Sequence, residues 1–91
     1  MAANFHIYSF KTRDSLHLKL AGDFDGSSAY ELINALLEQG KDFYEIFIDT
    51  NDLNTVHPFG IDVFQKTLRS SNKLFKNLVF LGKNGLEIGI S

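Results

Sequence analysis

The sequence contains no cysteine and no tryptophan, and it has a single proline. Without cysteine the chain has no disulfide, no thiolate ligand for zinc or an iron–sulfur cluster, and no cysteine nucleophile. No apolar run approaches the roughly 18 residues that a transmembrane helix needs. The first residues also lack the basic region and apolar stretch of a secretory signal. We therefore expect a cytoplasmic protein without membrane insertion.

The chain has 91 residues, which is enough for one hydrophobic core and too few for two. Residues 1–91 are therefore predicted to form a single domain. Hydrophobic residues make up 44% and charged residues 22% of the sequence, which is typical of a folded globular domain rather than a disordered one. The formal net charge is −2, whereas a general nucleic-acid binder needs a basic surface that neutralises phosphates. Nucleic acid is therefore not an expected partner.

Two alternating runs near the N-terminus predict a β-hairpin with its turn at residues 11–14. One face of this hairpin is purely apolar and consists of Phe5, Ile7, Leu16, Leu18 and Leu20. The other face is mixed and consists of His6, Tyr8, Phe10, His17 and Lys19. A turn of this length pairs Phe10 with Ser15 across the hairpin. Because the apolar face is expected to receive the helices, we predict that the mixed face stays uncovered.

Residues 28–39 are predicted to form a helix. Ser28 and Glu31 have the spacing of a capping box, in which the serine oxygen accepts a hydrogen bond from the third backbone N–H. Apolar residues then recur at helical spacing and form one stripe, made of Ala29, Leu32, Ile33, Leu36 and Leu37. Gly40 is placed to end the helix in the left-handed conformation.

The second half of the chain contains a strand, a helix and another strand. The aromatic and β-branched segment 44–49 predicts a central strand covered on both faces, and residues 50–57 are expected to form a loop. Pro58 is favoured at the first position of a helix, so a second helix is predicted to begin there. Residues 78–81 then predict a buried strand.

The resulting element order, β-β-α-β-α-β, predicts an α/β fold. A mixed β-sheet of four or more strands is expected, with the helices packed mainly on one face. Beyond the last of these strands, Asn84 and Gly85 favour a tight turn. Leu86, Ile88 and Ile90 alternate as a short edge strand would.

Four aspartates follow the apolar runs, namely Asp23, Asp25, Asp49 and Asp52. Their convergence would suit a magnesium site or paired carboxylates. Aspartates in loops more often accept hydrogen bonds from nearby backbone N–H groups, and we favour that interpretation. His57 could act as a base, a ligand or a phosphate acceptor. No acidic residue lies at a metal-ligand spacing from it within a helix, so an ordinary loop role is favoured, and no metal, cofactor or catalytic residue is predicted.

Two segments resemble the STAS family, the domain shared by bacterial anti-sigma-factor antagonists and the cytoplasmic tails of sulphate transporters. The first is an apolar strand that ends in glycine, an acidic residue, an apolar residue and aspartate, at residues 18–25, with Leu32 in the following helix. The second is residues 46–49, a central strand ending in aspartate, followed by Leu53, Val56 and Gly60. The resemblance spans residues 5–82 and implies a regulatory domain that docks a protein partner.

The start of the second helix departs from the family pattern. In family members that act as phosphorylation switches, a kinase modifies a hydroxyl in an aspartate-serine-serine-glycine type motif, and the matching residues here are His57, Pro58, Phe59 and Gly60. None of the four carries a hydroxyl, so no phosphorylation is expected there. Thr55 is the nearest hydroxyl and is only a weak substitute site.

The resemblance implies a partner-binding surface made of Asp23, Asp25, Thr55, His57, Pro58, Phe59 and Gly60. The expected partner is a protein, either an anti-sigma-factor-type kinase or another regulatory protein, and a homodimer is compatible with the pattern. We therefore predict a non-catalytic regulatory protein. The alternatives are an accessory subunit of a transporter ATPase, or a small ligand- or metal-binding domain that uses His57 and the acidic loops.

Overall fold

The structure is a computed structural model that describes residues 4–70 and 77–82. Its elements follow one another in the predicted order, with one short 3-10 helix added. They are β1 (His6–Lys11), β2 (Ser15–Phe24), α1 (Gly26–Gln39), η1 (Gly40–Asp42), β3 (Glu45–Val56), α2 (Pro58–Ser70) and β4 (Leu78–Leu81). The turn and edge strand predicted for residues 84–90 lie outside the described residues.

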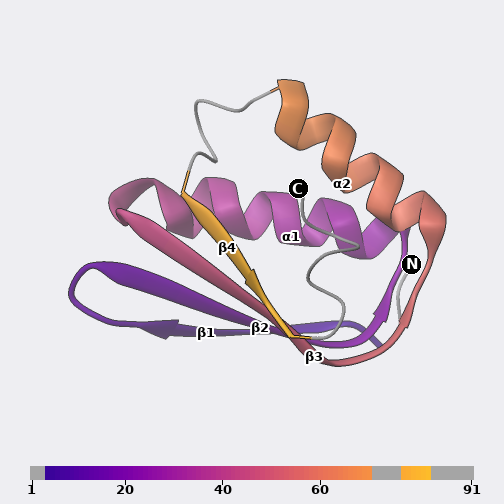
Figure 1. Cartoon of the computed structure of the whole chain (residues 1–91), viewed down its shortest axis with the longest axis horizontal. Coiled ribbons are helices and arrows are strands. Elements are labelled where there is room, and N and C mark those ends of the chain that lie inside the picture. Colours follow the sequence, from indigo (N-terminus) through magenta and orange to yellow (C-terminus); the bar gives the residue numbers. More distant parts are fainter. Residues whose placement is uncertain (1–3, 71–76, 83–91) are drawn as a thin grey trace.

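The strands form one sheet in the order β1-β2-β3-β4. β1 is antiparallel to β2, whereas β2, β3 and β4 run parallel because α1 and α2 serve as crossovers. Both helices lie on the same face of the sheet (Figure 1). The predicted mixed sheet with helices on one face is therefore confirmed. Neither helix in the described part of the chain has the length and hydropathy that a membrane span requires.

The core lies between the sheet and the helices. Leu16, Leu18 and Leu20 alternate along β2 and are fully buried, as the hairpin pattern predicted. Phe64 of α2 is also fully buried, and its ring meets that of Phe24 edge-on with centroids 6.3 Å apart. These apolar contacts hold α2 against the sheet.

The hairpin register differs from the prediction by two residues. Phe10 lies opposite His17 rather than Ser15. The turn begins one residue later than expected, because Thr12 and Ser15 bond to each other: the Thr12 amide donates to the Ser15 carbonyl at 2.9 Å, and the Ser15 amide donates to Thr12 Oγ1 at 3.1 Å. A shift of two residues keeps every side chain on its predicted face, since strand side chains alternate with period two.

β3 is longer than predicted, and the expected loop over residues 50–57 is wrong. The strand continues to Val56, which pairs with Phe24 of β2. Hydrophilic side chains do not prevent this, because most of them face solvent while the backbone groups pair with β2. Thr50 and Leu53 are buried, and the Thr50 hydroxyl donates to the Leu81 carbonyl at 2.7 Å. β2 follows this path through Gly22, which adopts a φ of 98° and where a Cβ would overlap the Asn4 carbonyl.

The predicted cover on both faces of segment 44–49 is also wrong. Ile46 and Ile48 are buried beneath the helices, whereas Phe47 and Asp49 on the opposite face are only partly buried. The reason is that both helices occupy one face. β4 is likewise less buried than predicted, since Val79 and Leu81 point away from the helices and are exposed.

α1 begins two residues before the predicted start. Asp25, not Ser28, is the N-cap residue, and its carboxylate accepts a hydrogen bond from the Ser28 amide at 2.9 Å. Gly40 is not left-handed either: its φ is −81°, and it opens the 3-10 helix η1. On the buried stripe, Ala35 takes the place predicted for Leu37, which is exposed.

Candidate functional site

The predicted partner-binding residues gather where α1 and α2 begin. β2 and β3 end side by side, and the His57 amide donates to the Phe24 carbonyl at 2.8 Å. Each strand then leads directly into its helix, so the two helix N-termini lie together at the carboxyl ends of parallel strands (Figure 1). We refer to Asp23, Asp25, Thr55, His57, Pro58, Phe59 and Gly60 as the helix-start cluster.

Gly60 brings the two helix starts into contact. A Cβ at this position would lie 2.7 Å from the carbonyl carbon and oxygen of Asp25. Side chains do not tolerate such a distance to backbone atoms, so only glycine allows this approach without a backbone shift. Pro58 opens α2 as predicted, and the His57 carbonyl accepts a hydrogen bond from the Ile61 amide at 3.2 Å. The cluster is therefore held by backbone contacts from both helices.

A hydrogen bond between side chains joins the two strand ends. The Thr55 hydroxyl donates to the Asp23 carboxylate at 2.8 Å, on the exposed surface of the cluster. Ser28, one turn into α1, is fully buried and donates from its hydroxyl to the Asp23 carbonyl at 2.7 Å. These bonds fix the loop between β2 and α1 from both sides.

Asp25 is the ionised centre of the cluster. The Ser28 amide and, secondarily, the Ser28 hydroxyl donate to its carboxylate and lower the pKa of Asp25, and the nearby His57 acts in the same direction. Partial burial of the carboxylate opposes this shift, but the hydrogen bond from the Ser28 amide outweighs it. A negative charge at the N-terminus of α1 is also favoured by the helix dipole. Asp25 therefore remains a carboxylate well into the acidic range.

This arrangement predicts two separable effects at Asp25. Replacement by alanine removes the cap, which should cost about 1 kcal/mol and lower the Tm by about 4–8 °C. Replacement by asparagine retains a capping oxygen but removes the charge, so it should cost less than alanine at pH 7 and make the Tm less dependent on pH. Because the folded pKa lies below the unfolded one, the carboxylate stabilises the folded chain above about pH 4, and this contribution disappears as the pH falls through the folded pKa.

Thermal unfolding from pH 7 to pH 2 measures both effects. The wild-type Tm should fall more steeply below about pH 4 than that of Asp25→Asn. Equal slopes for the two proteins would show that the Ser28 hydrogen bonds do not stabilise the charged form.

Phe59 is a large hydrophobic residue of the cluster that is exposed to solvent. Its side chain is 68% exposed, so it is not part of the hydrophobic core. The ring lies over the backbone of Gly26, where an added Cβ would come within 2.7 Å of it. One side of the Phe59 ring therefore contacts the backbone of Gly26, and most of the side chain is open to solvent.

The four aspartates do not converge. Asp23 and Asp25 belong to the helix-start cluster, whereas Asp49 accepts from the Asn51 amide at 2.9 Å and Asp52 pairs with Lys19 at 3.1 Å. Within residues 4–70 and 77–82 there is no group of three acidic or histidine side chains that could hold a metal ion. The preferred interpretation, in which these aspartates bond to nearby groups, matches the contacts observed for Asp25 and Asp49.

Two residues that support the helix-start cluster were not among the predicted site residues. Gly26 supports the Phe59 ring, and Ser28 brackets the β2–α1 loop rather than capping the helix. Gly26 carried a signal, because a glycine directly before a helix start often marks a close approach. Ser28 carried none, since a capping serine and a buried serine one turn later are alike in sequence.

No family model and no curated protein matches the sequence, but solved structures match the fold. An anti-sigma-factor antagonist STAS domain from Rhodobacter sphaeroides aligns with a TM-score of 0.70 at 13% identity, over 99% of this chain and 100% of that one. An uncharacterized DUF3478-family protein with a SpoIIAA-like fold from Shewanella loihica aligns at 0.62 with 17% identity, over 88% of this chain and 67% of the other.

The structure of a third protein, Mglu, contains a similar unit. It aligns with a TM-score of 0.71 at 12% identity and covers 84% of this chain, which spans only 19% of the Mglu chain. At these identities the likeness concerns the fold. The chain has the SpoIIAA-like fold of STAS domains, and the resemblance drawn from the sequence is confirmed at that level.

Proposed function

We propose that this protein is a non-catalytic regulatory module that docks a protein partner through the helix-start cluster. The observation that carries the proposal is the Phe59 ring, which is 68% exposed yet seated on Gly26 at the junction of two helix starts. Exposed aromatic rings held in place lose little conformational entropy on binding, and they dominate interface energetics when buried. The fold shared with the Rhodobacter STAS domain, an anti-sigma-factor antagonist, supports a regulatory role.

The module is proposed to be constitutive rather than switched by phosphorylation at the usual position. His57, Pro58, Phe59 and Gly60 offer no hydroxyl. The Thr55 hydroxyl is engaged by Asp23 at 2.8 Å. A phosphoryl group on Thr55 would bring a charge of about −1.5 to −2 against that carboxylate, which opposes its addition. Partner binding would then be set by expression and localisation in the cytoplasm.

The partner is proposed to be a protein of the anti-sigma-factor kinase type or another regulatory protein. Asp23 and Asp25 add two carboxylates to the same cluster of residues as Phe59, and Asp25 is held in its charged form. Such a surface fits a complementary patch with an apolar pocket for the ring and basic side chains around it. Charge pairing of this kind mainly raises the association rate and the specificity.

Site-specific photo-crosslinking tests the location of the docking surface. A photoreactive phenylalanine analogue at position 59, expressed in the native cell, should give a discrete adduct with one protein. The same analogue at Tyr44, which is 74% exposed near the start of β3, is the matched control and should give none. An adduct at position 44 and none at position 59 would move the docking surface to the other end of the sheet.

Affinity for the purified partner tests the role of the ring. Phe59→Ser should weaken binding by about 30-fold, as expected for a central aromatic anchor, with the Tm nearly unchanged. Tyr44→Ser removes an aromatic ring of greater exposure and should leave the affinity unchanged. Unchanged binding of Phe59→Ser would contradict the proposal.

A further inference from the structure

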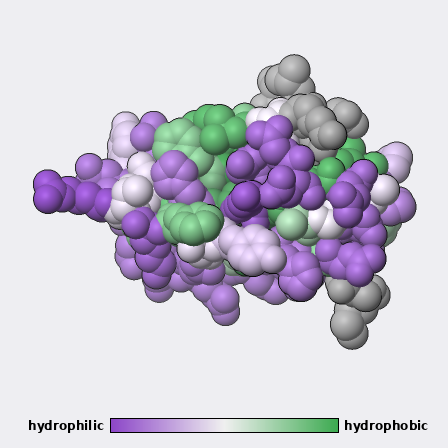
Figure 2. Space-filling model, turned by 90° about the horizontal axis from the view of Figure 1, so that it is seen from below, coloured by the Kyte–Doolittle hydropathy of each residue, from purple (hydrophilic) through white to green (hydrophobic). Residues whose placement is uncertain are grey.

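The sheet face opposite the helices is a second surface, separate from the helix-start cluster. Neither helix covers it, as the hairpin pattern predicted. Figure 2 shows this face, where hydrophobic patches lie between hydrophilic side chains. We refer to it as the open face.

The strand register arranges the open face in rows that cross the sheet. The aromatic row joins opposite partners on successive strands and consists of Phe10, His17, Phe47 and Val79. The next row, the charged row, consists of Tyr8, Lys19, Asp49 and Leu81. An apolar band therefore lies beside a band that carries one positive and one negative charge.

Both rows present apolar surface to solvent. Phe10 is 59% exposed and Tyr8 51% exposed, and at the other edge of the sheet Val79 and Leu81 are also exposed. In the middle, the rings of His17 and Phe47 stack with centroids 4.8 Å apart. Exposed apolar patches of this kind often mark interaction sites on soluble domains.

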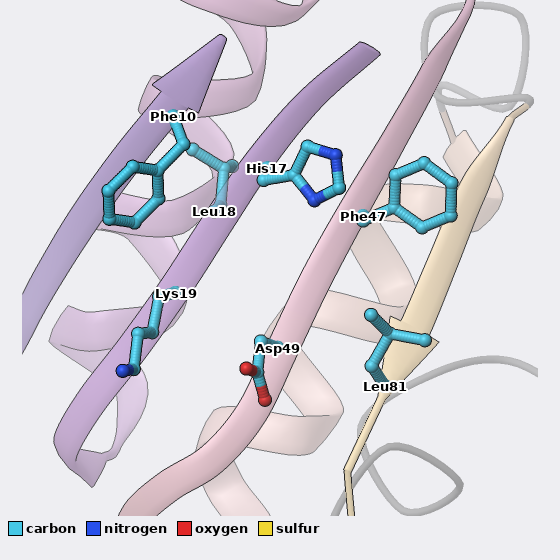
Figure 3. A pocket seen from close by; sticks show the side chains of 7 residues that line it. All are labelled: Phe10, His17, Leu18, Lys19, Phe47, Asp49 and Leu81. Atoms are coloured by element: carbon cyan, nitrogen blue, oxygen red, sulfur yellow. The ribbon is translucent and has the colours of Figure 1, made fainter. Parts of the chain in front are cut away.

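A shallow hollow of about 150 Å³ lies between the two rows. Its lining residues come from all four strands and are Phe10, His17, Leu18, Lys19, Phe47, Asp49 and Leu81 (Figure 3). The Lys19 amine is drawn away from the rings toward Asp52, with which it pairs at 3.1 Å.

We propose that a second copy of this chain packs on the open face, related by a two-fold axis. A two-fold interface needs a self-complementary surface, and the charged row provides both signs at neighbouring positions. With the axis between them, Lys19 of one copy meets Asp49 of the partner subunit, and the aromatic rows stack on each other. Sheets with parallel pairing are also generally covered on both faces, which the helices of one copy do not achieve.

The charge of the open face disfavours other occupants. Lys19 is its central cation, and it stands beside Asp49 and Asp52. A nucleic acid or an anionic membrane surface needs a positive footprint, which the described residues of this face do not provide. A second copy needs opposite charges that can face each other, and Lys19 and Asp49 provide them.

The area of the sheet limits the size of the dimer interface. At about 4.8 Å between strands and about 3.3 Å per residue, the four strands cover up to about 500 Å². A face-to-face pair would then bury about 1,000 Å², below the roughly 1,200 Å² at which stable interfaces begin. The interface therefore lies in the size range of weak, transient complexes.

Sedimentation velocity tests the proposal. Protein concentrations between about 10 µM and 1 mM are needed because an interface of this size is expected to be weak. The wild type should change from a 10.3 kDa monomer to a dimer over this range. Tyr8→Thr with Phe10→Thr keeps strand propensity and should remain monomeric at 1 mM. The matched control, Tyr30→Thr with Tyr44→Thr, removes two exposed rings outside the open face and should dimerise like the wild type. A wild type that stays monomeric at the highest concentration overturns the proposal.

A series of charge variants tests the two-fold geometry. It also tests the proposal independently if the Tyr8→Thr with Phe10→Thr variant does not fold. Lys19→Glu and Asp49→Lys should each weaken dimerisation about tenfold through like-charge contacts, and the double variant should recover it. Dimerisation that is indifferent to all three variants would exclude the open face. Phe59 takes no part in this interface, so a monomeric wild type would leave partner docking at the helix-start cluster unaffected.

Discussion

Replacing Phe64 with alanine should lower the stability of this protein by about 3–5 kcal/mol, the range measured for buried aromatic residues. Phe64 is fully buried and meets the rings of Phe24 and Phe80 edge-on, at centroid distances of 6.3 and 5.9 Å. Its removal leaves a cavity where α2 packs on the sheet. A domain of this size has only about 5–14 kcal/mol in total, so much of the margin would disappear.

Urea denaturation measures this loss. A protein concentration of about 5 µM keeps the chain below the range in which dimerisation through the open face is expected. Phe10→Ala is the matched control, because Phe10 is 59% exposed and its removal should cost less than about 0.5 kcal/mol. Equal losses for the two variants would mean that α2 does not depend on the Phe64 contacts. Phe64→Leu should fall between them, since leucine fills part of the cavity.

Replacing each of two glycines at the helix starts with alanine should have different outcomes. Alanine is preferred over glycine inside helices by about 1 kcal/mol, so both changes would stabilise isolated helices. At Gly60 the new Cβ meets backbone atoms of Asp25 at 2.7 Å, and we expect a net loss of about 1–3 kcal/mol. At Gly26 it meets only the Phe59 ring, which is exposed and can rotate away, so stability should change by less than about 0.5 kcal/mol.

Thermal unfolding distinguishes these variants, since 1 kcal/mol corresponds to about 4–8 °C for a domain of this length. Comparable Tm values for Gly60→Ala and Gly26→Ala would show that the helix starts are not in rigid contact. Gly26→Ala adds a functional readout, because it should displace the Phe59 ring and weaken partner binding without loss of stability. The two variants thus test two roles separately: Gly60→Ala tests the contact between the helix starts, and Gly26→Ala tests the position of the Phe59 ring.

The close contact at Gly60 also explains how a domain this small can present a fixed surface. Asp25 caps α1, and the same residue provides the backbone against which α2 begins. The Phe59 ring is therefore positioned by two helices and two strand ends rather than by a mobile loop. A surface that is ordered before docking loses less entropy when a partner binds.

Much of the architecture could be predicted from local sequence patterns. The period-two alternation of Leu16, Leu18 and Leu20 predicted both the strand and its buried face, and Pro58 correctly marked the start of α2. The departure of residues 57–60 from the phosphorylation motif was likewise visible in sequence. Such features depend on the chemistry and spacing of neighbouring residues, which a single sequence displays directly.

Other features depended on contacts between residues that are distant in sequence. The extension of β3 to Val56 follows from pairing with β2, although its residues 50–55 look like a loop. The exposed position of the Phe59 ring depended on its contact with Gly26. The capping of α1 by Asp25, rather than by Ser28 as predicted, depended on where β2 ends.

The sequence by itself therefore determined the order of strands and helices and which faces of the hairpin and of the first helix are apolar. Only the tertiary structure decided the strand register, the extension of β3 and the meeting of the two helix starts. The physical reason is that periodicity is a local property of the chain. Register and close approach are instead set by turn geometry and by the packing of segments that the sequence separates.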